Sequence, residues 1–332
     1  MTSIGIIGGG AFGTALACVT RRSGHDVLIW AREAEVVDAI NREGVNSHFL
    51  PDVPLVSGIR ATGDLAEATH GSDIILMAVP AQHVRAVAGQ MRASLQPSTP
   101  VVSCSKGVER GSCLLMPELL ALVLPESVLA VLSGPSFARE IANDLPCGVV
   151  LACADAILGE AVARQIASPR FCVHLSDDLI GAAIGGVMKN VISIASGIVA
   201  GRKLGENARA TLITLGLAEE MRLGLAKGAK QVTFSGLAGI GDLMLTANSL
   251  KSRNTSLGVA LGEGRRLADV LAERKEVTEG AFSVEAVAAL ARQLHVDMPI
   301  TLALDELLNH GLGLDDAMAQ IMRQLPPLLH AG

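Results

Sequence analysis

The first half of the chain alternates short runs of β-branched residues with helical patterns, and this rhythm constrains the fold more than any other feature. Strand-like runs occur at residues 3–8, 26–31, 72–79 and 100–105, and helical patterns separate them at about 12–23, 33–42 and 81–95. Such an alternation indicates βαβ units, whose crossover helices bring the strands together in a parallel sheet. We expect further runs at 128–134, 148–153 and 171–176 to extend this sheet.

The second half of the chain is helical in pattern. From about residue 179 onward, periods of three and four residues dominate, interrupted by a brief alternating run at 231–236. A chain of 332 residues is also long for one hydrophobic core, which favours two domains. We therefore predict an α/β protein with a doubly wound, mostly parallel sheet over residues 1–185 and an all-helical domain over residues 186–332. The hinge is expected near residues 176–190.

Composition argues against a nucleic-acid partner. The chain has 27 basic and 33 acidic residues, and a net charge of −6 opposes attraction to polyphosphate. It has one Trp and no Tyr, so platforms on which bases could stack are not expected. The six cysteines, at positions 18, 104, 113, 147, 153 and 172, form no CxxC pair. We interpret them as buried thiols of a reducing compartment and expect no metal site.

Two apolar segments invite a membrane interpretation, and both contain features that oppose it. The N-terminal stretch has no basic residue before its apolar run and is broken by Gly8, Gly9 and Gly10, unlike a signal peptide. The segment 179–201 carries Lys189 near its middle, and a lysine at a bilayer centre costs roughly 2.5–3.5 kcal/mol on insertion scales. We expect a cytoplasmic protein without a membrane span.

A glycine-rich turn follows the first predicted strand. Gly8, Gly10 and Gly13 give the spacing G-x-G-x-x-G, with Ala11 and Phe12 between the last two, and a small-residue helix follows. The first glycine permits a tight turn, the second allows a pyrophosphate to approach the backbone, and the third lets the helix pack closely on the strand. This pattern in this position predicts a dinucleotide site.

Arg32 stands where such a site often has a carboxylate. It follows the second predicted strand, about twenty residues after the glycines, and Glu33 lies beside it. A guanidinium suits the 2′-phosphate of NADPH, whereas Glu33 leaves NADH open. The alternative is a solvated surface arginine.

Lys189 lies in the middle of an apolar helical segment, with Asn190 beside it. On a helix, Gly185, Gly186 and Lys189 share one stripe, which continues at Ser193 and Ser196. We expect these small residues to leave room for a substrate beside a half-buried ammonium group. Burial lowers the pKa of a lysine, which would make Lys189 a general acid near neutral pH. A structural lysine whose amine reaches solvent is the alternative.

Further polar residues follow predicted strands or open helices. Lys106 comes directly after the strand-like run at 100–105, at the edge where doubly wound folds bind ligands, although it could be a loop lysine. Ser136, in the segment SGPSFARE, is interpreted either as a helix cap or as part of the cleft. Asp242 and Thr246 are four residues apart on one helix face, and Asp242 could also be an N-cap.

The segment Ser252-Arg253-Asn254 has the composition of a phosphate site. The planar guanidinium of Arg253 can bind two phosphate oxygens, and the flanking Ser and Asn side chains can add hydrogen bonds. A solvated arginine is again the alternative.

These motifs together resemble those of the bacterial NAD(P)-dependent glycerol-3-phosphate dehydrogenases. The matching segments run in order through most of the chain: GGGAFGTALA, VSCSKGVE, SGPSFAREIA, MKNVISIASGIVAG, FSGLAGIGDLMLT, SRN and VTEG. The resemblance implies a Rossmann-type domain joined to an all-helical domain, with the active site between them. It also implies reversible reduction of dihydroxyacetone phosphate by NADPH or NADH to sn-glycerol 3-phosphate, a precursor of phospholipids. A homodimer is similarly implied.

The same resemblance implies roles for individual residues. Lys189 corresponds to the catalytic lysine, supported by Asp242 and Thr246, with Asn190 and Lys106 at the reacting centre. The substrate contacts carried over, besides Lys106, Lys189 and Asp242, are Gly134, Ser136, Ser252, Arg253 and Asn254. The cofactor contacts carried over, besides the glycine turn and Lys106, are Phe12, Arg32, Ala138, Arg253, Val277 and Glu279. Two other functions stay open: a reductase of the same plan acting on a hydroxy or keto acid, and a non-catalytic dinucleotide sensor.

Overall fold

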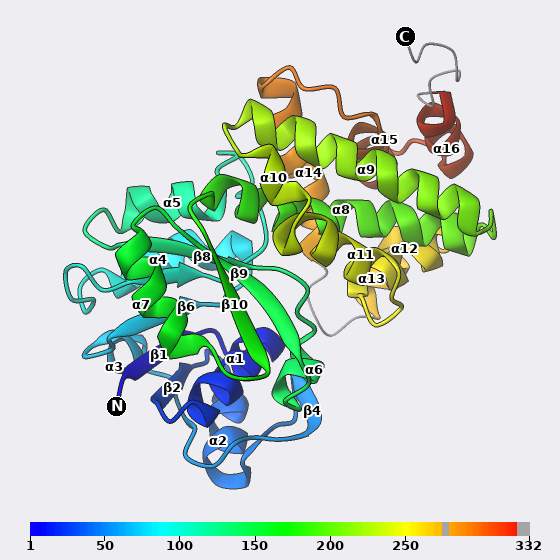
Figure 1. The fold of residues 1–332 in the computed structure, drawn as a ribbon. Coiled ribbons are helices and arrows are strands. Elements are labelled where there is room, and N and C mark those ends of the chain that lie inside the picture. The colour runs from blue at the N-terminus through cyan, green and yellow to red at the C-terminus, as the bar shows by residue number, and fades with distance from the viewer. Residues whose placement is uncertain (274–278, 324–332) are drawn as a thin grey trace.

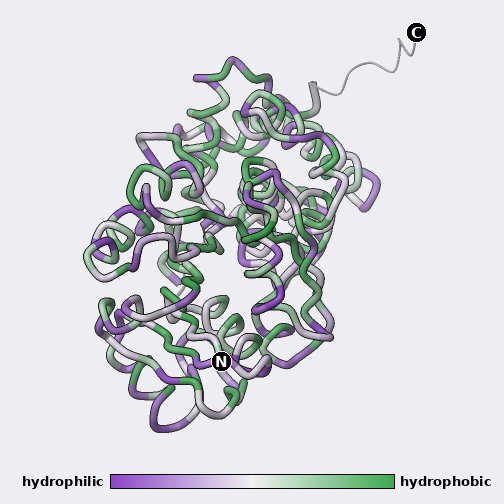
Figure 2. Tube along the Cα trace, turned by 60° about the vertical axis from the view of Figure 1, so that its left-hand side comes forward, coloured by the Kyte–Doolittle hydropathy of each residue, from purple (hydrophilic) through white to green (hydrophobic). Residues whose placement is uncertain are grey.

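The computed structural model describes residues 1–273 and 279–323. An eight-stranded sheet with helices forms one lobe, and a group of helices forms the other (Figure 1). Figure 2 shows hydrophobic segments running through the interior of both lobes and hydrophilic residues on many outer turns.

The sheet has the strand order β10-β9-β8-β7-β6-β1-β2-β5. All pairs are parallel except β8 with β9, which is antiparallel, so the predicted mostly parallel sheet is confirmed. The strands are β1 (Ser3–Ile7), β2 (Asp26–Trp30), β5 (Arg60–Thr62), β6 (Ile74–Met77), β7 (Val101–Ser103), β8 (Leu129–Ser133), β9 (Cys147–Cys153) and β10 (Phe171–Ser176). A separate antiparallel hairpin contains β3 (Val45–Asn46) and β4 (Leu50–Pro54).

Helices cover both faces of the sheet because its strands are apolar on both sides. In β1, Ile4 and Ile6 belong to one buried cluster and Ile7 to another, as expected for side chains that alternate across a strand. The sheet lobe contains α1 (Ala11–Arg22), α2 (Ala34–Glu43), α3 (Leu65–Thr69), the short 3₁₀ turn η1 (Ala81–His83), α4 (Val84–Met91), α5 (Met116–Val123), α6 (Ala138–Ala142) and α7 (Ala156–Ile166).

The helical lobe is built around α8 (Leu179–Gly201), which runs through its middle (Figure 1). The other helices are α9 (Glu206–Ala226), α10 (Gln231–Phe234), the π-helical turn η2 (Leu237–Gly241), α11 (Asp242–Ala247), α12 (Arg253–Gly262), α13 (Leu267–Ala272), α14 (Glu279–Gln293), α15 (Pro299–Asn309) and α16 (Leu314–Arg323). The alternating run at 231–236 is therefore a short helix and a turn. The boundary at residues 185 and 186 falls inside α8 and stays a prediction.

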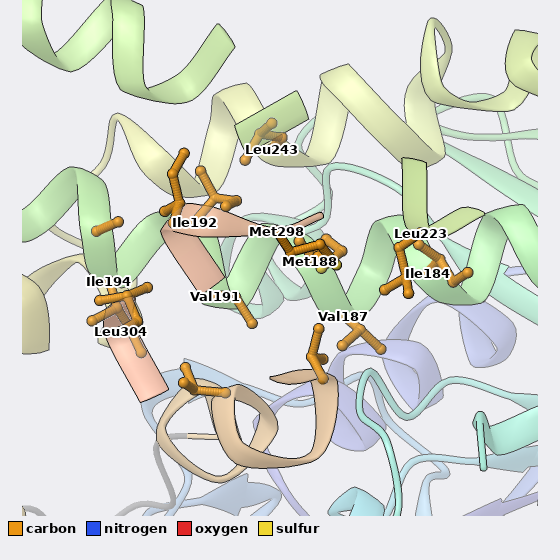
Figure 3. Packing of buried hydrophobic residues seen from close by; sticks show 14 of the residues in the cluster. Ile184, Val187, Met188, Val191, Ile192, Ile194, Leu223, Leu243, Met298 and Leu304 are labelled. Carbon is orange, nitrogen blue, oxygen red and sulfur yellow. The ribbon is translucent and has the colours of Figure 1, made fainter. Parts of the chain in front are cut away.

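Helix α8 is long and apolar enough to cross a membrane by length and composition, yet its most apolar 18-residue window is 94% buried inside the protein. Figure 3 shows Ile184, Val187 and Val191 of α8 among buried side chains of other segments, including Leu243 of α11 and Met298, which precedes α15. The structure thus assigns its hydrophobicity to a protein core, and no membrane span is shown.

Two helices approach each other through glycines. A Cβ on Gly197 of α8 would lie 2.2 Å from the carbonyl oxygen of Thr255, and one on Gly258 of α12 would lie 2.0 Å from that of Ile194. The backbones of α8 and α12 therefore touch directly, which only glycine permits at these positions.

The cysteine prediction is partly wrong. Cys18, Cys104, Cys113 and Cys153 are buried, but Cys147 is half-buried and Cys172 is exposed. Cys172 lies on β10, an outer strand of the sheet, so its side chain faces solvent.

Candidate active site

The glycine turn joins β1 to α1 and has the geometry that a dinucleotide requires. Gly8 has a φ of +126°, and a Cβ on Gly13 would lie 2.0 Å from the carbonyl oxygen of Gly8. A Cβ on Gly10 would meet nothing within 4 Å, so this part of the turn is open.

The N-terminus of α1 faces that open side without a capping side chain. Gly10 is the N-cap, and in the described residues no protein acceptor takes a hydrogen bond from the backbone amides of Gly10, Ala11 or Phe12. Amides at a helix N-terminus bind phosphate oxygens and lie in a positive dipole field. The turn therefore fits the pyrophosphate of a dinucleotide.

Arg32 is exposed beyond the end of β2. Its guanidinium forms an ion pair with Glu33, with Nη2 2.8 Å from Oε1. The structure thus places a cation and a carboxylate together at the tip of the second strand, as the sequence predicts.

Two lysines converge on one buried carboxylate. Lys106 follows β7 and places Nζ 2.6 Å from Oδ2 of Asp242, while Lys189 of α8 places Nζ 3.0 Å from Oδ1. Asp242 is the first residue of α11 and is fully buried. Lys106 belongs to the sheet lobe, and the other two belong to the helical lobe, so the cluster lies where the lobes meet.

The π-helical turn η2 brings Asp242 into this position. Gly239 lies so close to α10 that a Cβ there would be 2.4 Å from Cα of Phe234, and Gly185 of α8 would collide with the carbonyl oxygen of Ala238 in the same way, at 2.0 Å. The space beside Gly185 is therefore filled by the backbone of η2. Gly186 likewise faces Ser133 and the Lys106 stem, so the expected substrate space at these two glycines is wrong.

Thr246 lies one helical turn after Asp242 and completes the contacts of Lys189. Nζ of Lys189 donates to Oγ1 of Thr246 at 3.3 Å, and Oγ1 donates to the carbonyl oxygen of Asp242 at 2.7 Å. The interpretation of Asp242 as an N-cap is wrong, because Gly241 holds that position.

The electrostatics follow from burial and from the charges in the cluster. Burial lowers the pKa of Lys189 to about 8, and the charge of Asp242 limits the shift. Burial alone would raise the pKa of Asp242, but the ammonium groups of Lys106 and Lys189 outweigh it and hold that pKa below its usual value. The cluster therefore holds an ionised carboxylate beside a lysine that can release a proton near neutral pH.

Amide side chains connect the cluster to α12 and α14. Nδ2 of Asn190 donates to the carbonyl oxygen of Lys106 at 3.3 Å, and Oδ1 of Asn190 accepts from Nδ2 of Asn254 at 2.8 Å. Oδ1 of Asn254 accepts from the amide of Gly280 at 3.1 Å. Asn190 and Asn254 thus form one chain of hydrogen bonds behind Lys106.

The loop after β8 borders the same cluster. Nζ of Lys106 donates to the carbonyl oxygen of Gly134 at 3.1 Å and to Oγ of Ser136 at 3.4 Å. Ser136 is not the cap of α6: Phe137 is the N-cap, and the Ser136 hydroxyl donates to Gly134 instead. Ala138 is the first residue of α6.

The remaining predicted residues lie at the edge of the site or outside the described chain. Ser252 caps α12, its Oγ accepting from the amide of Thr255 at 3.2 Å, and Arg253 is exposed at the start of that helix. Burial raises the pKa of Glu279, and the charge of Arg253 limits that rise, so the two side chains interact electrostatically. Val277 lies outside the described residues.

Sequence reasoning missed two buried polar residues near these groups. Glu220 of α9 is fully buried, and neither carboxyl oxygen has a hydrogen-bond partner in the described part of the chain. Burial, followed by the charge of Asp242, raises its pKa well above the usual value. Asn46 contacts the glycine turn from the β3–β4 hairpin. The local sequence does not single out either residue. Glu220 follows Glu219, and two neighbouring glutamates are typical of a solvent-exposed helix face.

Comparison with known proteins agrees with this architecture. The family profile described as NAD-dependent glycerol-3-phosphate dehydrogenase N-terminus matches residues 3–158, and the C-terminus profile of the same family matches residues 178–319.

Individual relatives match nearly the whole chain. Glycerol-3-phosphate dehydrogenase (NAD(P)+) of Parvibaculum lavamentivorans is 50% identical over 96% of this chain and 96% of its own. The Rhodospirillum rubrum enzyme of the same name is 50% identical over 96% of this chain and 91% of its own. The crystal structure of glycerol-3-phosphate dehydrogenase from Coxiella burnetii has a TM-score of 0.94 at 37% identity, covering 97% of this chain and 99% of that one. The chain therefore belongs to the NAD(P)-dependent glycerol-3-phosphate dehydrogenase family.

Proposed function

We propose that this protein reduces dihydroxyacetone phosphate with NADPH or NADH to sn-glycerol 3-phosphate, reversibly, and so supplies the backbone of phospholipids. The observation that carries the proposal is the Lys106–Asp242–Lys189 cluster where the two lobes meet. We further propose that residues 1–185 hold the dinucleotide, that residues 186–332 complete the catalytic site, and that the enzyme is a cytoplasmic homodimer.

When bound, the dihydronicotinamide supplies a hydride to the ketone carbon of the substrate. Negative charge then grows on the ketone oxygen, and Lys189 transfers its proton from Nζ to that oxygen, giving the alcohol and leaving a neutral amine. In the reverse direction the neutral amine removes the hydroxyl proton. Lys106 adds positive charge beside the same oxygen, which stabilises the developing alkoxide.

Asp242 acts through the two lysines. Its carboxylate oxygens contact both ammonium groups and hold them a fixed distance apart, while Thr246 fixes the direction of Lys189. Asn190 and Asn254 keep the Lys106 backbone in place. We assign these residues to orientation of the proton donor rather than to proton transfer itself.

The substrate phosphate is assigned to the loop after β8 and to the start of α12. Gly134 and Ser136 lie beside Lys106, whereas Ser252, Arg253 and Asn254 begin a helix whose N-terminal dipole favours an anion. Arg253 supplies the charge that binds two phosphate oxygens.

The cofactor is assigned to the glycine turn and to residues around it. The residues are Gly8, Gly10, Ala11, Phe12, Gly13, Arg32, Lys106, Ala138, Arg253, Val277 and Glu279. The open amides of Gly10 and its two successors support this assignment of the pyrophosphate. Arg32 beside Glu33 accommodates either dinucleotide.

One assay tests the proposal. NADPH and NADH oxidation is followed with dihydroxyacetone phosphate, with non-phosphorylated ketones and with 2-keto acids. We expect turnover with the phosphorylated triose above all others. Preference for a keto acid would support a different reductase, and absence of oxidation with every substrate would support a dinucleotide sensor.

A further inference from the structure

We infer that Asn46 is a positioning residue for the cofactor: it fixes the peptide group between Gly9 and Gly10 so that the Gly10 amide faces the dinucleotide pyrophosphate. The inference rests on the proposed function, because it requires the dinucleotide to lie at the glycine turn. Asn46 belongs to the β3–β4 hairpin, which is outside the main sheet.

The side chain of Asn46 is fully buried and all of its polar atoms are used. Nδ2 donates to the carbonyl oxygen of Gly9 at 2.8 Å and to Oγ1 of Thr14 at 2.8 Å. Oδ1 accepts from the amide of Phe49 at 3.1 Å. The hairpin thus holds its own turn with one atom of Asn46 and the glycine turn with the other.

The geometry of a peptide group connects this contact to the cofactor side. A trans peptide is planar, so the C=O of Gly9 and the N–H of Gly10 point in opposite directions. Because Asn46 binds the Gly9 carbonyl on the buried side, the Gly10 amide must point to the open side. In the described residues no protein acceptor takes a hydrogen bond from this amide, and a Cβ on Gly10 would meet nothing within 4 Å.

This peptide needs an external restraint. Both of its residues are glycines, which have the fewest steric limits on backbone rotation. Gly10 is the N-cap of α1 and receives no capping bond from a side chain. The 2.8 Å hydrogen bond from Asn46, with a longer one of 3.5 Å from Oγ1 of Thr14, therefore selects one orientation of this glycine peptide and pre-orders an amide donor before the pyrophosphate arrives.

Asn41 provides a matched control for this role. Its Nδ2 donates to the carbonyl oxygen of Ala61 and its Oδ1 accepts from the amide of the same residue, both at 2.8 Å. It therefore holds α2 on β5 by the same chemistry, with no contact to the glycine turn. Asn41→Asp removes the donor to the Ala61 carbonyl while leaving the Gly9–Gly10 peptide untouched.

The test compares Asn46→Asp, Asn46→Ala and Asn41→Asp in the full-length enzyme. Asn46→Asp keeps the shape and the acceptor for Phe49 but removes both donors and places an oxygen against the Gly9 carbonyl. Dissociation constants are measured by fluorescence titration for NADPH and, by competition, for adenosine 2′-phosphate, which has no pyrophosphate. Melting temperature reports folding.

We expect both Asn46 variants to weaken NADPH binding about tenfold, the effect of one poorly placed hydrogen bond to a charged group. Binding of adenosine 2′-phosphate and the KM for dihydroxyacetone phosphate at saturating cofactor should stay within about twofold of wild type. Asn41→Asp should lower the melting temperature without weakening NADPH binding.

Several results would overturn the inference. A folded Asn46→Ala protein with unchanged NADPH affinity would show that the hairpin contact is structural only, and so would equal losses for NADPH and for adenosine 2′-phosphate. The alanine variant decides the matter if the buried carboxylate of Asn46→Asp prevents folding. Failure of the wild-type enzyme to bind NADPH would instead reject the proposed function.

Discussion

A lysine donates a proton near neutral pH only when its charged form is destabilised, and Lys189 meets this condition by burial in α8. Asp242 opposes part of that effect, so the ammonium stays mostly protonated at pH 7 and can still lose its proton. Two opposing influences thus leave the amine able to release a proton and to take one up near neutral pH.

Lys189→Ala should lower kcat for dihydroxyacetone phosphate reduction by roughly a hundredfold or more, because general acid catalysis contributes about that much. Steady-state kinetics and NADPH titration check this, with NADPH affinity expected to be retained. Lys230→Ala is the control, since Lys230 pairs with Asp177 at the surface and forms no ion pair with Asp242. Near-normal kcat in a folded variant would remove Lys189 from the mechanism.

The pH dependence of kcat/KM should have opposite signs for ketone reduction and for alcohol oxidation. Reduction needs protonated Lys189, so kcat/KM should fall as pH rises through about 8, while oxidation of glycerol 3-phosphate needs the neutral amine and should rise through the same range. Initial rates between pH 6 and 10, an interval chosen to span this pKa, measure both limbs. Profiles that bend in the same direction would contradict the assignment.

Arg253→Ala should chiefly raise KM for the phosphorylated substrate, since the guanidinium is assigned to ground-state and transition-state phosphate binding alike. We expect at least about a tenfold rise, with a smaller change in kcat. Arg265→Ala, which removes an exposed arginine paired with Glu273, is the control. An unchanged KM would reject the phosphate role.

Residue-level patterns singled out some of the buried polar residues described above and missed others. Lys106, Lys189 and Asp242 each stand in a segment with a recognisable composition, and the structure brings them together. Asn46 and Glu220 have no such segment. Their burial arises from contacts between elements distant in sequence, which no local pattern encodes.

At the scale of elements, two adjacent glutamates of α9 contact different helices. Glu219 holds the N-terminus of α15, accepting from the amide of Thr301 at 3.1 Å and from its Oγ1 at 2.7 Å. The amide of Ile300 donates to the same carboxylate. Glu220, the next residue, instead faces α8 at Gly185. The buried residues of α9 recur every three to four positions, and both glutamates lie on this buried face, where charge alone would predict solvent exposure.

The Glu219 contact makes stability depend on pH. Burial raises its pKa to about 7, so the folded state binds a proton that the unfolded state releases above about 4.5. The free energy of unfolding should therefore fall between about pH 4.5 and 7, by roughly 3 kcal/mol from this group, and then level off. Glu219→Gln should remove this dependence. Urea unfolding at several pH values checks it, and an equal slope in both proteins would contradict it.

The glycine contact between α8 and α12 is a second property of elements. Gly258→Ala would force a Cβ to within 2.0 Å of the Ile194 carbonyl oxygen and should destabilise the protein by about 2 kcal/mol or more. Gly89→Ala in α4 is the control, because it meets nothing within 4 Å and should stabilise by about 0.5–1 kcal/mol. Denaturant unfolding measures both. Equal effects would show that the two helices can separate without cost.

At the scale of the whole molecule, the rhythm of strands and helices sufficed to predict two different halves and a mostly parallel sheet. It could not predict that β9 runs antiparallel to β8, or that η2 is π-helical. Strand direction depends on which neighbours a strand meets after a long connection, and the π-helical turn depends on close contact with α8. Both are consequences of tertiary packing.

The two lobes are also tied by pairs outside the cluster. Arg110 of the sheet lobe contacts Glu285 of α14, and Lys227 at the end of α9 contacts Glu118 of α5. Lys251 reaches across to Glu140 of α6 at 3.0 Å. These contacts join the two lobes at three further points.

Asp242 is anchored in one lobe and takes one of its two counter-cations from the other. If the lobes separated, Lys106 would move away from Asp242, and the carboxylate would interact with Lys189 alone. The pKa of Lys189 would then rise. Under the proposed mechanism, separation of the lobes would therefore favour reprotonation of Lys189.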